Sequence, residues 1–386
     1  MKIIKTNWFN DADSPVVLMV DDLDNLWFDL NKNGYLDIGE DWGYWRDLPN
    51  SSFTFLKKNL LNKFPEIKVT FFSVVGNPVI CEYKCGKVYR GSINQHYKVA
   101  EFFNRIHHSP NFEIAYHGLT HGVMKNDKYI PEWLSYNSTE EALKRINEGQ
   151  KICKKVFGEQ LKGGKYPCCA SNIYSDESVD KAGFLWWCRS WTKDNKLRED
   201  YATLEMKTFG KSDVVDFPST VNPSVLTRNP IKRMAQFIFK NPYHRLERYF
   251  EELLQNKIVI SIQEHAGVIK ANGIRQTPNI IDDMPVLQHI YSFLREKNVW
   301  YATCSEIANY YIAFTTTNVE AVDNSSFELK YTGKIEKPWL TLLIDRAYPA
   351  EVISPSGRRY KSVKSLRKDK QNLVNIEVEN GYYQIK

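Results

Sequence analysis

The sequence predicts an α/β protein: a distorted barrel of seven or eight βα units over residues 1–315, followed by a small antiparallel β domain over residues 316–386. Short, almost continuously apolar runs alternate with stretches of helical periodicity as far as about residue 312, which is typical of parallel strands covered on both faces. Beyond that point, apolar and polar residues alternate between turn residues, and no helical pattern is evident.

Seven apolar runs predict the strands of the barrel. They are VVLMV (16–20), IKVTFFSVV (67–75), FEIAY (112–116), FLWWC (184–188), VVDF (214–217), KIVISI (257–262) and VWYAT (299–303). Five stretches with apolar residues at helical spacing lie between them, at 51–64, 97–108, 138–157, 242–255 and 284–297. Ser138 and Glu141 have the spacing of a capping box, which predicts where the third helix begins. This alternation favours a parallel barrel or an open α/β sheet.

Composition excludes several classes of protein. A formal charge of +6 over 386 residues is too small for the dense basic surface of a nucleic-acid binder. No apolar run approaches the roughly 18 residues of a membrane span, and the N-terminus turns polar too early for a signal peptide. The 7 cysteines are odd in number and scattered, which predicts reduced thiols and a cytoplasmic location. Cys81 and Cys85 lack the second pair that a four-cysteine zinc site needs. The basic run at 358–370 indicates a hairpin with one face exposed to solvent.

Acids and imidazoles follow the predicted strands, and Lys165 follows the segment LKGG (161–164). In parallel α/β folds the carboxyl ends of the strands carry the active site. The residues found there are Asp21, Asp22, His117, His121, Lys165, Asp216, Glu264 and His265.

Each of these residues alone has an ordinary explanation. The two aspartates could form a turn or an N-cap, and Asp216 could belong to a buried ion pair. His117 and His121, four residues apart, would share one face of a helical turn, which suits a zinc ion but also occurs in ordinary histidine pairs. Together, however, the set provides the ligands, the base and the acid of metal-assisted hydrolysis.

The sequence resembles the polysaccharide deacetylases of carbohydrate esterase family 4. Between residues 16 and 265, the segments MVDD, HGLTH, KYP, VDFPS and SIQEH follow the order of that family's Asp-Asp, His-x-x-x-His, Arg-x-Pro, Asp-Trp-type and Leu-x-x-His motifs. The resemblance implies a distorted barrel of the deacetylase type. The sequence departs from the family at Leu23, Lys165 and Ala266, where the family has glycine, arginine and often aspartate.

The resemblance also implies roles for individual residues. Asp22, His117 and His121 would hold Zn²⁺ or another divalent transition metal. Asp21 would be the general base, His265 the general acid, and Asp216 the partner that orients His265. Lys165, at the arginine position, would belong to the same catalytic group. The substrate implied is an acetylated sugar or polysaccharide.

A separate motif follows the Asp-Asp pair. Residues 29–40, DLNKNGYLDIGE, fit the pattern D-x-[DN]-x-[DN]-G-x5-E of a calcium loop. The expected Ca²⁺ ligands are Asp29, Asn31, Asn33, Tyr35, Asp37 and Glu40, with Tyr35 contributing its backbone carbonyl. The alternative is an Asx-rich turn that binds no ion. No second loop and no pair of flanking helices is evident, so the motif indicates a structural ion and not a sensor.

The sequence alone leaves three functions open. The first is hydrolysis of the N-acetyl group of an acetamido sugar or glycan by a metal-activated water. The second is hydrolysis of another non-peptide C–N bond on the same fold. The third is recognition of a glycan without catalysis, which would not require both Asp21 and His265.

Overall fold

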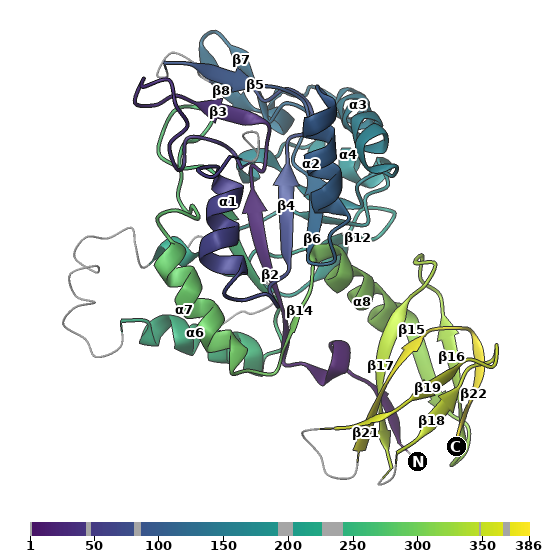
Figure 1. Cartoon of the computed structure of the whole chain (residues 1–386). Coiled ribbons are helices and arrows are strands. Elements are labelled where there is room, and N and C mark those ends of the chain that lie inside the picture. Colours follow the sequence, from purple (N-terminus) through teal and green to yellow (C-terminus); the bar gives the residue numbers. More distant parts are fainter. Residues whose placement is uncertain are drawn as a thin grey trace. The chain divides into compact units, whose positions relative to one another are not determined.

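The structure is a computed structural model that describes residues 2–43, 48–80, 86–191, 204–225, 242–346, 349–365 and 371–386 (Figure 1). Its chain divides into two compact units. One comprises Val16–Glu296 and Tyr301–Ser305, and the other Met1–Pro15, Lys297–Trp300 and Glu306–Lys386. This division differs from the expected boundary at residue 315, because the first residues of the chain group with the C-terminal β strands.

The larger unit is built on a sheet of parallel strands. In spatial order these are β12 (Val214–Asp216), β10 (Trp186–Cys188), β9 (Gly163–Lys165), β6 (Phe112–Tyr116), β4 (Val69–Ser73), β2 (Ser14–Asp21) and β13 (Ile260–His265). The strand β11 (Lys207–Phe209) pairs with β12 in the antiparallel sense. Beyond β12, Val221 forms a parallel bridge with Ile262 of β13. That bridge closes the ring, so the structure confirms the predicted distorted barrel.

Helices cover the barrel at the five predicted stretches, and one further helix, α4, was not predicted. They are α1 (Ser52–Leu56), which continues into the π-helical segment η3 (Lys57–Leu61), α2 (Tyr97–His107), α3 (Thr139–Phe157), α4 (Ser175–Lys181), α6 (His244–Gln255) and α7 (Met284–Arg295). Two more elements follow α7 in the chain, β14 (Val299–Tyr301) and α8 (Cys304–Thr316). None of the described helices is long and apolar enough to cross a membrane.

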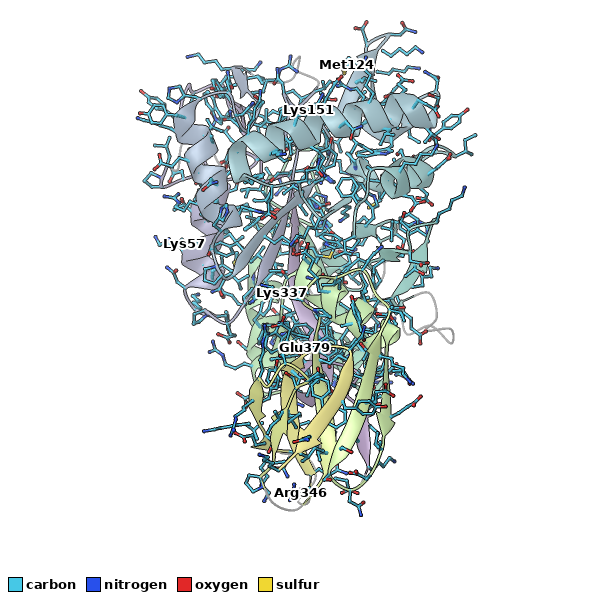
Figure 2. All side chains as sticks on the ribbon, turned by 90° about the vertical axis from the view of Figure 1, so that its right-hand side faces the viewer. Lys57, Met124, Lys151, Lys337, Arg346 and Glu379 are labelled. Carbon is cyan, nitrogen blue, oxygen red and sulfur yellow. The ribbon has the colours of Figure 1, made fainter. Side chains whose placement is uncertain are left out.

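The helix α3 shows how local sequence sets an element. The Ser138 side chain accepts a hydrogen bond from Glu141 N at 3.1 Å, and Glu141 Oε2 accepts one from Asn137 N at 2.9 Å. These bonds satisfy donors that a helix start leaves free. Gly158 ends the helix in the left-handed conformation, with φ 80°. Lys151 lies on the exposed face of α3 (Figure 2).

The strand β9 was not predicted as a strand because its sequence is Gly-Gly-Lys. Both glycines are required by packing. A Cβ on Gly163 would lie 1.9 Å from the Trp186 ring, and one on Gly164 would lie 2.4 Å from the Trp187 ring. The two indoles thus occupy the space that side chains of β9 would need, and the strand carries Lys165 at its end.

Two small antiparallel sheets lie beyond the carboxyl ends of β2 and β4 (Figure 1). One pairs β3 (Leu26–Phe28) with β5 (Val88–Arg90), and the other pairs β7 (Gly122–Lys125) with β8 (Lys128–Pro131). They belong to the segments that form the rim of the barrel.

The antiparallel β structure predicted for residues 316–386 is present in the smaller unit as two sheets, one of which also contains β1. In spatial order, one consists of β15 (Thr317–Ala321), β16 (Ser326–Tyr331), β22 (Gly381–Ile385), β18 (Glu351–Ile353) and β19 (Arg359–Lys361). The other consists of β1 (Ile3–Lys5), β17 (Trp339–Asp345), β21 (Gln371–Glu377) and β20 (Val363–Lys364). In the basic run, Arg359 pairs with Glu351 at 3.1 Å on the surface, and residues 366–370 lie outside the described residues.

Candidate active site

The predicted site residues meet at the carboxyl ends of the parallel strands. Asp21 is the last residue of β2, His117 follows β6, Lys165 ends β9 and His265 ends β13. All four line a cavity of about 350 Å³, together with Asp22, His121, Tyr129, Cys168, Cys169, Trp191, Gln263, Lys270 and Gln276. Asp216 does not contribute to this lining.

Asp22, His117 and His121 form a compact cluster of potential metal ligands. One donor atom from each lies within 4.8 Å of the other two. Asp22 Oδ1 is 3.6 Å from His117 Nε2 and 3.4 Å from His121 Nε2, and all three side chains are buried. Two imidazoles and one carboxylate are the ligand set of many catalytic zinc sites.

The expected helical turn between the two histidines is wrong. His117 follows β6 directly, and the chain turns through Gly118 at φ 96° and His121 at φ 64°. Asp22 also has a left-handed backbone, with φ 67°. Such conformations are costly for residues other than glycine and are concentrated at functional sites. Here they turn two of the three ligands toward one point.

Neighbouring groups set the tautomers of both histidines. His117 Nδ1 lies 3.0 Å from the carbonyl oxygen of Lys165, so Nδ1 carries the proton and donates it there. His121 Nδ1 lies 2.5 Å from the Tyr129 hydroxyl, which itself donates to His121 O at 3.0 Å. Each Nε2 therefore presents a lone pair to the cluster, as a metal ligand requires.

The electrostatics of the cluster also fit a cation. Burial, reinforced by the charge of Asp21, raises the pKa of Asp22 well above its usual range, and Asp22 Oδ1 has no hydrogen-bond partner among the described residues. Burial lowers the pKa of His117 to about 4 and that of His121 well below its usual value, so both rings are neutral. A divalent metal would compensate the buried carboxylate and use both lone pairs.

Asp21 is held by Lys165. The Lys165 ammonium lies 2.9 Å from Asp21 Oδ2 and 3.2 Å from Oδ1, so it contacts both oxygens, and it also donates to Gln263 Oε1. Burial alone would raise the pKa of Asp21, but the charges of Lys165, His117 and His265 outweigh it and lower the pKa to about 2. The carboxylate is therefore ionised at neutral pH.

The expected contact between Asp216 and His265 is not formed. His265 Nδ1 donates to the carbonyl oxygen of Pro278 at 2.8 Å. Asp216 instead pairs with Arg189 at 3.2 Å. Burial lowers the pKa of His265 to about 4, so the ring is neutral, and its Nε2 lies 3.7 Å from Asp21 Oδ2.

Several supporting residues were not identified from the sequence. Glu132 is buried and accepts hydrogen bonds from Leu119 N, Thr120 N and Tyr136 Oη at 3.1, 2.8 and 2.6 Å, which fixes the loop between the two histidines. Tyr129 lies in β8 and Glu132 follows that strand directly, and neither has a signature in the local sequence. Gln263 could have been found, because residues two apart on β13 face the same side.

The residues of the predicted calcium loop also lie close together. Asn31 Nδ2 and Asn33 Nδ2 both donate to Asp37 Oδ2, at 2.5 and 2.9 Å. Asp29 and Glu40, at the two ends of the loop, are buried, whereas Tyr35 is exposed.

Comparison with known proteins gives similarity at the level of structure only. No protein-family model and no curated protein matches the sequence. Four of the five sequence motifs meet in one cavity. The chain resembles polysaccharide deacetylases. Among solved structures, it is similar to a "putative polysaccharide deacetylase" from Mycobacterium smegmatis, at 13% identity and TM-score 0.47, with 81% of this chain and 94% of that chain covered.

Two further structures show a similar level of resemblance. The PuuE allantoinase has 14% identity and TM-score 0.45, with coverage of 79% of this chain and 92% of that chain. A family 4 acetyl xylan esterase from Clostridium thermocellum, solved with a cobalt ion, has 13% identity and TM-score 0.36, with coverage of 76% and 90%.

Proposed function

We propose that the chain is a metal-dependent deacetylase that hydrolyses the N-acetyl group of an acetamido sugar or glycan. One observation supports the proposal most strongly. Asp21 and His265 line the same cavity as the ligand cluster of Asp22, His117 and His121, so a base and an acid lie beside a metal site. A protein that only recognised a glycan would not need this combination.

Asp22, His117 and His121 would hold the metal, with Zn²⁺ or another divalent transition metal favoured by the ligand types. Such an ion, when bound, polarises an amide carbonyl and acidifies a water molecule. Asp21, which is ionised, accepts the proton of the attacking water as the bond to the carbonyl carbon forms. The Lys165 ammonium, 2.9 Å away, holds the carboxylate in place.

His265 delivers a proton to the leaving amine nitrogen. Its pKa of about 4 means that the ring is neutral before the reaction and must first gain this proton. Asp21 is the nearest source, because its Oδ2 lies 3.7 Å from His265 Nε2. The Pro278 carbonyl accepts the proton on Nδ1 and so keeps Nε2 directed into the cavity. The proton taken from water thus reaches the amine by way of two side chains.

The test combines metal analysis with acetate release. The purified chain is assayed for bound metal, stripped with a chelator and reloaded separately with Zn²⁺, Co²⁺ or Ni²⁺. Each form is then incubated with N-acetylglucosamine oligomers, peptidoglycan fragments, acetylated xylan and acetylated polyamines. We expect acetate from an acetamido sugar substrate only in metal-loaded forms. Release from the polyamines alone would support the other C–N hydrolase, and glycan binding without acetate release by any form would contradict catalysis.

A further inference from the structure

None of the residues 29–40 lines the cavity of the proposed deacetylase site. This segment connects β3 to Asp41, and Trp27 of β3 bridges to Asp41 as an antiparallel pair. Phe28 N also donates to Glu40 O at 2.7 Å. The loop therefore begins and ends on two paired extended segments, and no helix flanks it among the described residues.

Oxygen-bearing side chains from positions far apart in this loop converge. The amides of Asn31 and Asn33 both donate to Asp37 Oδ2, which joins the third, fifth and ninth positions. Glu40, at the twelfth position, accepts from Leu30 N at 2.9 Å and from Asp37 N at 3.0 Å. Its carboxylate thus folds back over the start of the loop.

Asp29 provides an independent indication of a missing ligand. The residue is only 2% exposed, and its Oδ1 has no hydrogen-bond partner among the described residues. The other oxygen, Oδ2, accepts from Gly34 N at 3.2 Å, which directs the carboxylate toward the middle of the loop. A buried carboxylate oxygen without a partner is costly unless a cation or a donor compensates it.

The negative charge of the loop also indicates that a cation belongs there. Asp29, Asp37 and Glu40 place three carboxylates within one twelve-residue loop, and none forms an ion pair with a described lysine, arginine or histidine. Three negative groups within twelve residues repel one another unless a cation lies between them.

We propose that this loop is a structural Ca²⁺ site, separate from the transition-metal cluster. The side chains of Asp29, Asn31, Asn33, Asp37 and Glu40 and the Tyr35 carbonyl supply only oxygen. Such a set favours a hard cation with many ligands, whereas the two imidazoles at Asp22 favour a transition metal. The Asn31 and Asn33 oxygens accept from Asn33 N and Tyr35 N, at 3.0 and 2.7 Å, and each keeps a second lone pair for the ion.

The structure also suggests what the ion would stabilise. Trp42 lies two residues after Glu40, and its indole packs edge-on against the His121 ring at a centroid distance of 5.3 Å. Trp42 Nε1 donates to Ile269 O at 2.9 Å, in the segment that follows His265. An ion that fixes Glu40 would therefore hold Trp42 between a metal ligand and the chain beyond the catalytic histidine. The paired ends of the loop provide no helices to move, so this is a structural role and not that of a sensor.

The experiment titrates Ca²⁺ alone into the full chain, followed by calorimetry and thermal unfolding. The wild type should bind one ion in addition to its transition metal, and its melting temperature should rise with calcium concentration. Asp29→Asn and Glu40→Gln should abolish both effects. Asn31→Ala changes an exposed residue that cannot disturb the core, and it should lower calcium affinity at least about tenfold by removing one ligand.

Two controls separate this site from the deacetylase site. Asp127→Asn makes the same chemical change on the exposed turn between β7 and β8 and should leave calcium binding intact. His117→Ala should lose the transition metal and still bind Ca²⁺. The proposal is overturned if the wild type shows neither saturable binding nor a shift in melting temperature, or if Asp29→Asn, Glu40→Gln and Asn31→Ala all bind as the wild type does.

Discussion

Lys165 Nζ lies 2.9 Å from Asp21 Oδ2, and both side chains are buried and line the cavity. A lysine thus occupies the position where the resembled family has arginine, and its single nitrogen contacts both carboxylate oxygens. Because burial opposes ionisation of Asp21, the ammonium is what keeps the proposed base charged.

Replacing Lys165 with methionine should move the acidic limb of the activity profile to higher pH. Without the ammonium, burial dominates and raises the pKa of Asp21 above its present value of about 2. The change leaves a buried charge unpaired, which typically costs about 3–5 kcal/mol of stability. The pH dependence of kcat/KM measures the shift, and Lys165→Arg, which restores a cation, should retain the wild-type profile. An identical profile in Lys165→Met would contradict the assigned role.

His117→Ala should remove the transition metal while the barrel stays folded. His117 lies at the carboxyl end of a strand, where residues serve function more than stability. Metal content and circular dichroism measure the two properties. His108→Ala, which removes an exposed histidine outside the cavity, is the matched control and should keep the metal. Equal metal content in the two variants would exclude His117 as a ligand.

Asp21→Asn and His265→Ala should each retain the metal and lose most of the activity. Each side chain handles a proton in the proposed reaction, and such groups contribute about 10²–10⁴-fold to the rate. Steady-state acetate release on metal-loaded protein measures the loss. Activity of Asp21→Asn within a few-fold of the wild type would eliminate Asp21 as the base.

Tyr129→Phe should weaken metal binding without removing a ligand. The Tyr129 hydroxyl accepts the Nδ1 proton of His121 and so fixes the orientation and tautomer of the ring. Loss of such a supporting partner typically reduces metal affinity about 10–100-fold. A competition titration with a chromogenic chelator measures the affinity. Unchanged affinity would show that Trp42 and the backbone suffice to hold His121.

Asp41 should make the protein less stable as pH rises from about 4 to 7. Burial, only partly offset by hydrogen bonds from Ser52, raises its pKa to about 7. The unfolded chain releases this proton at lower pH, so folding binds a proton across that window and stability falls with rising pH. Between pH 5 and 8 the loss amounts to about 2–3 kcal/mol.

Asp41→Asn provides the comparison for that prediction. Its amide cannot ionise, so the free energy of unfolding of the variant should fall less between pH 5 and 8 than that of the wild type. Urea unfolding at a fixed calcium concentration measures both proteins. Parallel pH dependences would show that Asp41 keeps an ordinary pKa in the folded state.

The barrel strands could be predicted because burial on both faces leaves a continuous apolar run, as in VVLMV of β2. The strand β9 could not, since its glycines are dictated by Trp186 and Trp187, which are distant in sequence. The candidate metal ligands were implied by the family resemblance, although the chain between the two histidines turns through left-handed residues and not through a helix.

Tertiary contacts account for the other discrepancies. Asp216 precedes a segment that pairs with β13, but its carboxylate forms an ion pair with Arg189 and does not contact His265. The carbonyl oxygen of Pro278 accepts the hydrogen bond from His265 that Asp216 was expected to accept. Neither contact has a signature in local sequence. The supporting roles of Tyr129 and Glu132 also depend on a tertiary contact, because the hairpin of β7 and β8 folds back onto the loop between His117 and His121.

The pairing of β1 with β17, which sets Ile3 opposite Ile344, has a consequence for biosynthesis. The ribosome makes β1 before the barrel, whereas its partner strand β17 is made only after the whole barrel has been translated. The barrel can therefore fold during translation, whereas the β unit must wait until its two distant pieces are both available. Closing so long a loop costs entropy and slows folding. Until β17 has been synthesised, the backbone hydrogen-bonding groups of β1 are unpaired. A chaperone or a misfolded neighbouring chain would therefore bind the nascent chain first at β1.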